Sequence, residues 1–301
     1  MNHSLSYRKV NVLSLQNGTM IKERYEVKKF MCIARLTELY EVIDKEKGDA
    51  RCVMKFFNIN NEAFQVEYDF LDKCRGVRGF PYLVEKIEPE IDGKKYKGIV
   101  TSYEGESWLS LLQRRKYKIS IENTLRMGYK VFCLLETMHQ KGYVHRDVQF
   151  SNILVEISYG GDVDVKLVDF EHTVVHTPAP DSLVMTGWNV SLDVIKGKPY
   201  TVFDDFASLV CNLMVSQGIN PFGFSTESYL EFKEQFNNNP MSHFQRPETK
   251  WIGRLHEEIE SQRTVGYNKA AIMEIFKNAL EGVSPSSPIS YTITNGVLFI
   301  D

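Results

Sequence analysis

Three polar residues near the middle of the chain stand at a spacing that constrains its fold more than any other feature. Asp147 and Asn152 lie five positions apart, and Asp169 follows seventeen residues after the asparagine. A carboxylate can accept a proton from a hydroxyl group, and amide and carboxylate oxygens are ligands that suit Mg²⁺. A chance spacing on a surface loop is the alternative, but a helical pattern precedes this segment and an apolar run follows it. The spacing therefore predicts a site for phosphoryl transfer.

A lysine and a glutamate earlier in the chain supply the other charged groups that such a site needs. Lys55 follows the apolar run 52–54, and Glu67 comes twelve residues later, in a predicted helix over 62–74. An ammonium group that is oriented by a helix carboxylate can hold the α- and β-phosphates of a nucleotide. Lys55 could instead be an ordinary exposed strand lysine, and Glu62 is the alternative partner. The apolar surroundings of Lys55 favour the functional role.

The segment expected to cover the phosphates lacks glycine. Cys32, Ala34 and Thr37 occupy the three positions where glycine usually lets the backbone approach the phosphates and adopt open dihedral angles. Small residues keep part of this closeness but lose the dihedral freedom, so we expect weaker or slower closure over the nucleotide. Three apolar residues are expected to enclose the adenine, although each would serve equally well in an ordinary core: Leu39, Val53 and Leu154.

Taken together, these residues resemble the pattern of the protein kinase fold, with two further departures. Gln149 stands two residues after the predicted base, where serine/threonine kinases carry a lysine that neutralises the migrating phosphoryl group. An amide offers only a neutral hydrogen bond, which is weaker. Glu171 replaces the glycine after Asp169-Phe170 and adds negative charge beside the metal site. Because Asp169 is kept, we expect metal binding to be impaired and not abolished.

Periodicity along the chain predicts an α+β fold with a small β-rich lobe and a larger, mainly helical lobe. Residues 25–100 alternate like strands around the single helix 62–74, with turn signals at 45–49 and at Asp92-Gly93. We expect five strands and one helix in this lobe. After residue 100, the periodicity predicts helices over 120–138, 205–214, 227–236 and 269–280. It predicts strands over 153–157, 163–170 and 291–300.

The expected domain organisation follows from these patterns. An N-terminal extension covers 1–21, a kinase-like domain covers 22–282, and a C-terminal tail covers 283–301. Within the domain, the small lobe is expected to end at about 101 and the large lobe to begin at about 105.

Charge and cysteine content limit the classes of function. A formal net charge of −3 gives no overall attraction to nucleic acid or to anionic membranes. The five cysteines are scattered without a C-x-x-C pair, and no signal peptide or membrane span is evident. We therefore expect an intracellular protein of the cytoplasm, the nucleus or both. The basic patch 114–118 is interpreted as a solvated loop, with a site for an acidic partner as the alternative.

Two motifs outside the common kinase core make the resemblance more specific. The segment 105–109, Gly-Glu-Ser-Trp-Leu, is similar to the Gly-Pro-Ser-Leu signature of the casein kinase 1 group, which includes the vaccinia-related kinases. The segment 203–209 resembles the Asp-Asp-Leu-Glu-Ser-Leu helix of that group. The resemblance covers about residues 25–280. It implies ATP and Mg²⁺ as cofactors, and serine or threonine hydroxyls of proteins as phosphoryl acceptors.

The same resemblance implies roles for further residues. It places Thr101 as the gatekeeper and Ser102-Tyr103-Glu104 as the hinge that binds the adenine. It also makes Asp205 a brace for the loop 145–147, His-Arg-Asp, which carries the predicted base. Casein kinase 1 enzymes carry basic residues after Asp-Phe-Gly that favour acidic or phosphorylated substrates. The stretch 171–195 of this chain contains no lysine or arginine. That substrate preference is therefore not carried over.

Two alternatives to an active protein kinase remain. Small-molecule kinases such as choline and aminoglycoside kinases use a His-x-Asp loop, often with glutamine two residues later, and choline kinases carry an Asp-Phe-Glu triplet. Gln149 and Glu171 match these features. The 36 residues from Asp169 to Asp205 leave room for the activation segment of a protein kinase, which favours a protein acceptor. The second alternative is a pseudokinase that binds nucleotide or a partner. All five principal polar groups are present, which favours an enzyme with reduced activity: Lys55, Glu67, Asp147, Asn152 and Asp169.

Overall fold

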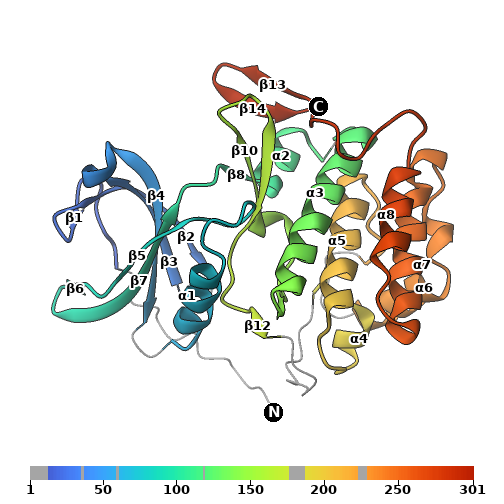
Figure 1. Cartoon of the computed structure of the whole chain (residues 1–301), viewed down its shortest axis with the longest axis horizontal. Helices are drawn as coiled ribbons and strands as arrows, with labels where there is room; N and C mark the ends of the chain where they lie inside the picture. Colours follow the sequence, from blue (N-terminus) through green and yellow to red (C-terminus); the bar gives the residue numbers. More distant parts are fainter. Residues whose placement is uncertain (1–12, 35–36, 59–60, 118, 176–186, 223–228) are drawn as a thin grey trace, which may run out of the picture. The chain divides into compact units, whose positions relative to one another are not determined.

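The computed structural model describes residues 13–34, 37–58, 61–117, 119–175, 187–222 and 229–301, and it divides the chain into two compact units. The N-terminal unit ends at Tyr103, and the C-terminal unit begins at Glu104. Figure 1 shows a twisted sheet with one helix in the first unit and a largely helical second unit.

The N-terminal unit is a seven-stranded antiparallel sheet with the strand order β1-β2-β3-β4-β7-β5, in which β6 pairs with β7. Its elements are β1 (Met20–Ile21), β2 (Tyr25–Ala34), β3 (Thr37–Asp44), the 3₁₀ turn η1 (Lys45–Lys47), β4 (Ala50–Asn58), α1 (Ala63–Lys73), β5 (Leu83–Ile87), β6 (Glu90–Ile91) and β7 (Lys94–Ser102). The predicted single helix and both predicted turns are present. The prediction of five strands is wrong because β1 and β6 have two residues each, too few to show any alternation.

Alternation along β4 separates an apolar core from a more polar face. Cys52, Met54 and Phe56 are buried together with side chains of β2 and β3. Leu13 belongs to the same core, and its backbone N–H donates to both carboxylate oxygens of Glu38, at 2.8 and 3.0 Å. Residues that precede β1 are therefore part of this sheet's packing.

The C-terminal unit contains seven helices in its described residues, with small sheets at one side. The helices are α2 (Trp108–Arg114), α3 (Ile121–Gln140), α4 (Leu192–Ile195), α5 (Val202–Ser216), α6 (Tyr229–Asn238), α7 (Lys250–Val265) and α8 (Lys269–Lys277), with 3₁₀ turns η2 (Phe150–Asn152), η4 (Pro240–His243) and η5 (Pro247–Thr249). The strands are β8 (Glu106–Ser107), β9 (Tyr143–Val144), β10 (Ile153–Ile157), β11 (Val163–Leu167), β12 (Val174–Val175), β13 (Tyr291–Thr294) and β14 (Val297–Ile300).

Local signals explain where the central helices of this unit begin. The hydroxyl of Ser120 accepts the N–H of Asn123 and caps α3, at the start of the helix predicted over 120–138. Thr201 and Asp204 form a capping box that starts α5 three residues earlier than expected. Figure 1 shows α5 between α3 and the pair α7 and α8, and aromatic side chains such as Phe132 and Phe206 fill the space between α3 and α5. These two helices form the frame behind the candidate site.

Two elements of the C-terminal unit differ from the sequence-based expectation. The strand predicted over 163–170 ends at Leu167, because Asp169 adopts a positive φ of 67°, which is incompatible with an extended strand. The strand-like run 291–300 is a hairpin, β13–β14, turned by Asn295 and Gly296 at φ values of 53° and 76°. Asn-Gly is the strongest short signal for such a turn and could have been used.

The C-terminal hairpin explains the basic patch. Arg114 donates to the carbonyl of Leu298, and Arg115 Nε donates to the carbonyl of Ile300 at 2.8 Å. The fully buried Asn123 donates to the carbonyl oxygen of Asp301 at 2.9 Å. The interpretation of the patch as a solvated loop is therefore wrong for its two arginines, which bind this hairpin.

Within the described part of the chain, no helix combines the length and the apolar character needed to cross a membrane.

A buried histidine in α7 makes the stability of the C-terminal unit depend on pH. Burial, reinforced by Lys233 and Arg263, lowers the pKa of His256 to about 3. The unfolded chain takes up the proton at about pH 6.5, so the stabilisation is complete above that pH and is lost as the pH falls. We expect the free energy of unfolding to fall by about 2 kcal/mol more between pH 7 and pH 5 in the wild type than in His256→Gln. Urea denaturation at both pH values measures this difference, and equal losses would contradict it.

Candidate active site

One face of the N-terminal sheet collects the residues that the sequence assigns to nucleotide binding. The strand register places Leu39 opposite Lys55, and Val53 opposite Thr101. Directly paired residues of antiparallel strands project from the same face, and residues two apart on one strand do so too. Cys32 pairs with Leu39 and lies on that face as well. Leu39, Val53 and Thr101 are half-buried. The sheet therefore aligns a half-buried apolar surface with the lysine.

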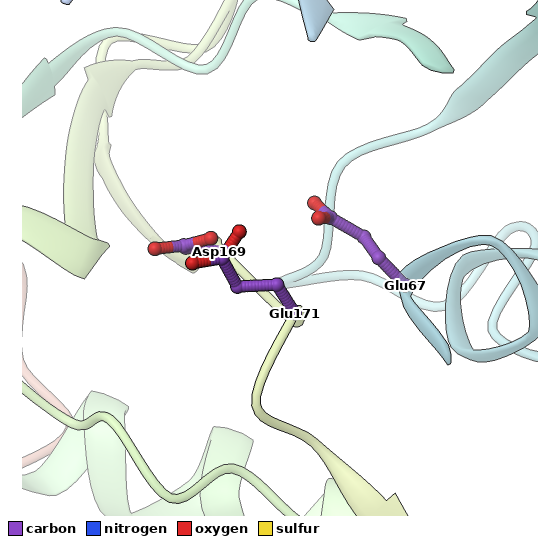
Figure 2. A group of neighbouring side chains, drawn as sticks. All are labelled: Glu67, Asp169 and Glu171. Carbon is purple, nitrogen blue, oxygen red and sulfur yellow. The ribbon is translucent and has the colours of Figure 1, made fainter. Parts of the chain in front are cut away.

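Lys55 and Glu67 form the predicted ion pair. Nζ of the lysine lies 2.7 Å from Oε2 of the glutamate, and the side chains are 7% and 8% exposed. Figure 2 shows Glu67 projecting from α1. The alternative partner Glu62 is exposed and marks the start of α1. Because the pair is nearly dry, the carboxylate orients the ammonium more firmly than it would at the surface.

The segment that lacks glycine lies on two paired strands, β2 and β3, whose register shifts between Phe30 and Cys32. Ala34 pairs with Thr37, and the Thr37 hydroxyl donates to the carbonyl of Ala34 at 2.7 Å. Cys32, Ala34 and Thr37 all have negative φ values and lie within β2 and β3. The three substitutions thus suit strand backbone, and the hydroxyl of Thr37 joins the ends of the two strands.

The first two residues of the predicted hinge, Ser102 and Tyr103, are held by contacts within the N-terminal unit. Ser102 pairs with Tyr82 in both directions, because its N–H donates to the Tyr82 carbonyl and its Oγ accepts the Tyr82 N–H at 2.7 Å. The guanidinium of Arg51 lies over the ring of Tyr103, and its Cζ atom is 3.7 Å from the ring centroid. Arg51 in turn pairs with Glu41, at 2.9 Å, on the same face as Val53. Sequence reasoning missed Arg51 and Glu41, although the charge alternation along β3 and β4 is visible.

In the C-terminal unit, the predicted base is held by amides. Nε2 of Gln149 donates to both oxygens of Asp147, at 3.1 and 2.9 Å. Nδ2 of Asn152 donates to one of those oxygens at 2.9 Å and to the Asp147 carbonyl at 3.0 Å. The carboxylate is therefore positioned by neutral donors. Leu154 is half-buried two residues beyond Asn152, on β10, which pairs with β8 after the hinge.

The loop that carries this base is braced by a fully buried carboxylate. Oδ2 of Asp205 accepts the N–H of His145 and Nε2 of His139, and Oδ1 accepts the N–H of Arg146 and the hydroxyl of Tyr200, all at 2.8–2.9 Å. Burial alone would raise the pKa of Asp205, but the bond from His139 and the charges of both histidines outweigh it and hold the pKa below its ordinary value. Asp205 therefore stays charged and fixes the loop, which is the role implied by the resemblance.

The two predicted metal ligands lie on adjoining stretches of backbone. The N–H of Val168 donates to the carbonyl of Asn152 at 3.0 Å, and the Val168 carbonyl lies 3.1 Å from Nε2 of His145. Asp169 follows directly and turns its backbone at positive φ. The Nδ2 of Asn152 is engaged by Asp147, and its amide oxygen accepts the hydroxyl of Ser151 at 3.3 Å and has a second lone pair for another partner. An amide oxygen and a carboxylate are the hard donors that suit Mg²⁺, so these residues fit a metal that also binds phosphate oxygens.

Glu171 adds a second carboxylate to this loop. Its donor oxygens lie within 4.8 Å of those of Asp169, and the residue is 8% exposed. Figure 2 shows both side chains rising from the same turn of backbone. Glu171 thus adds negative charge beside the predicted metal ligand Asp169.

Comparison with known protein families supports the fold described above. The sequence model of the protein kinase domain matches residues 25–281. The chain belongs to the protein kinase domain family. The β-rich N-terminal unit and the helical C-terminal unit are the two lobes of this kinase fold. Membership implies ATP as the phosphoryl donor and a divalent metal, typically Mg²⁺. Lys55 would hold phosphates, and Asn152 and Asp169 would hold the metal.

Individual relatives are distant. The chain is similar to nucleosomal histone kinase 1 of Drosophila melanogaster, with 28% identity over 130 residues, which is 42% of this chain and 22% of that protein. It is similar to the serine/threonine/tyrosine-protein kinase HT1 of Arabidopsis thaliana, with 27% identity over 210 residues, 65% of this chain and 52% of that protein. The serine/threonine-protein kinase zyg-8 of Caenorhabditis elegans is 25% identical over 196 residues, 58% and 24% of the two chains. The matches thus span between about a fifth and about half of these relatives.

Replacing the base separates its role from nucleotide binding. We expect Asp147→Asn to abolish phosphoryl transfer while ATP·Mg²⁺ affinity changes little, because the carboxylate acts on the acceptor hydroxyl and not on the nucleotide. Rate measurements and calorimetric titration with ATP·Mg²⁺ check both parts. Asp162→Asn, an exposed site in the turn between β10 and β11, is the matched control. Loss of ATP binding in a folded Asp147→Asn protein would show that the role is misassigned.

Proposed function

We propose that the protein is an ATP- and Mg²⁺-dependent serine/threonine protein kinase of casein kinase 1-like type with reduced activity. The observation that carries this proposal is the carboxylate of Asp147, whose two oxygens are held by the amides of Gln149 and Asn152. A positioned base with the buried Lys55–Glu67 pair and two hard metal ligands supplies the groups that phosphoryl transfer needs. The complete set favours an enzyme over a pseudokinase.

The same geometry supports a reduced rate. The Gln149 amide occupies the place of a cation and gives the transferring phosphoryl group no charge neutralisation. The carboxylate of Glu171 lies within 4.8 Å of that of Asp169 and adds to the negative charge that a triphosphate meets. Both effects raise the barrier without removing a catalytic group.

Local packing supports the finer assignment to the casein kinase 1 group. Gly105 has a φ of 90°, and a Cβ atom there would collide with the carbonyl oxygen of Val155, so the position requires glycine. This glycine opens the segment 105–109 that resembles the signature of the group. The segment 203–209 lies on α5 and presents Asp205 to the loop of the predicted base. Both motifs thus have a structural reason to be present.

We also propose protein substrates within the cytoplasm or the nucleus. Scattered cysteines without a paired motif support a reducing compartment.

Thr173, a residue near Glu171 that could be phosphorylated, is 1% exposed, so its hydroxyl is sheltered from a modifying enzyme. The other residues of the expected activation segment that could carry a phosphate, Thr177, Ser182 and Thr186, lie outside the described residues.

The class of acceptor is tested directly with labelled ATP. We expect label on casein or on myelin basic protein, as acidic and basic protein probes, and none on choline or aminoglycosides. Asp147→Asn, which should label nothing, is the control for contaminating kinases. Labelling of choline without labelling of protein would replace this proposal by a small-molecule kinase. ATP·Mg²⁺ binding without labelling of any acceptor would support the pseudokinase instead.

Restoring a cation tests the proposed cause of low activity. We expect Gln149→Lys to raise kcat, because an ammonium near the γ-phosphate contributes on the order of 1–3 kcal/mol, as other charge-assisted hydrogen bonds do. Gln149→Met keeps the length of the side chain without a donor and should lower kcat by releasing Asp147. A rate for Gln149→Lys at or below that of the wild type would mean that the site is adapted to the amide.

A further inference from the structure

A lysine in α6 is buried in an unusual environment. Lys233 is 3% exposed and forms no ion pair among the described residues; burial lowers its pKa, and the carboxylate of Glu260 opposes this only from beyond ion-pair distance. Its Nζ lies 2.7 Å from the carbonyl oxygen of Trp188, 3.2 Å from Sγ of Cys211 and 3.6 Å from the ring centroid of Phe222. Burial of an ammonium group without an anion costs several kcal/mol. Such a side chain therefore points to a role other than stability.

The carbonyl that this lysine binds belongs to a segment that contacts the loop of the predicted base. The ring of Trp188 stacks on Phe150, with centroids 5.4 Å apart and an interplanar angle of 19°. Nδ2 of the neighbouring Asn189 donates to the carbonyl of Val148 at 3.1 Å. Val148 and Phe150 flank Gln149, whose amide holds Asp147. The segment 187–190 is therefore joined to both sides of the residue that positions the base.

We propose that Lys233 is a positioning residue for the protein acceptor: it holds the Trp188 carbonyl and thereby fixes the segment 187–190 beside the base. An acceptor hydroxyl must reach Asp147, and the segment is bonded to the residues around that carboxylate. This inference rests on the proposed protein kinase function. It concerns the acceptor side of the reaction, because none of the three contacts of Lys233 involves a residue assigned to nucleotide or metal.

The chemistry of the three contacts explains why a lysine is needed. A carbonyl oxygen and a thiol accept hydrogen bonds from an ammonium group, and an aromatic face attracts its charge. Methionine has a similar length and fills the same apolar space, but it donates no hydrogen bond. Lys233→Met would thus remove the link to Trp188 while leaving α6 packed, and the carbonyl would lose its donor in a buried place.

The test separates acceptor binding from nucleotide chemistry. For Lys233→Met we expect the KM for casein, or for myelin basic protein if that is the protein labelled, to rise at least about tenfold, equivalent to about 1.4 kcal/mol. The KM for ATP and the rate of ATP hydrolysis without acceptor should stay within about twofold, since water needs no acceptor segment. Lys196→Met is the matched control. It breaks an exposed 2.7 Å ion pair with Glu234, which lies next to Lys233 on α6, and it should leave both KM values unchanged.

A second variant and a second measurement keep the inference open to refutation. Trp188→Ala retains Lys233, removes the stack on Phe150 and should raise the same KM, which decides the matter if Lys233→Met does not fold. Hydrogen exchange should quicken at the amides of 187–190 in Lys233→Met and stay unchanged in α3. An unchanged acceptor KM in either variant, or an equal loss of acceptor phosphorylation and acceptor-free hydrolysis, would overturn the inference. Wild-type protein that labels no protein probe would refute the proposed function, whereas unchanged exchange would refute the anchoring itself.

Discussion

The carboxylate of Asp205 is fully buried, and four donors from three parts of the C-terminal unit converge on its two oxygens. One donor comes from α3, two are backbone N–H groups of the loop that carries Asp147, and one is the hydroxyl of Tyr200. A buried carboxylate is tolerated only when its lone pairs are satisfied, so each donor depends on the others. Through Asp205, the packed helices α3 and α5 hold the loop that carries Asp147 in one conformation.

The loop needs such support because parts of its backbone are strained. Arg146 and Asp169 have φ values of 71° and 67°, and a residue other than glycine in this region costs about 1–3 kcal/mol. Asp205 binds the N–H of Arg146, and the bonds of Val168 with Asn152 and His145 hold the backbone just before Asp169. The residues assigned to proton transfer and metal binding thus owe their positions to hydrogen bonds made by their neighbours.

Sequence reasoning succeeded where one local pattern decides one structural feature. The Lys55–Glu67 pair and the helix that begins after Ser120 both follow from local rules. It failed where contacts join distant segments. The arginines at 114 and 115 look solvated in sequence because their partners are backbone carbonyls 184 and 185 residues away. Lys233 gave no signal either, since its carbonyl and ring partners belong to no motif. Short strands such as β1 have no period to detect.

The C-terminal hairpin lies beyond the region that matches the family, yet it completes the start of the longest helix of the unit. The N–H of Ser120 and the side chain of Asn123 both donate to the carbonyl oxygen of Asp301, about 180 residues later. A ribosome has therefore delivered nearly all of this sequence before α3 can acquire its full set of contacts. Until the hairpin is in place, the N–H of Ser120 and the side chain of Asn123 lack this acceptor, and the large lobe is open to misfolding. Closure of the hairpin is thus expected to be a late step in the folding of the large lobe.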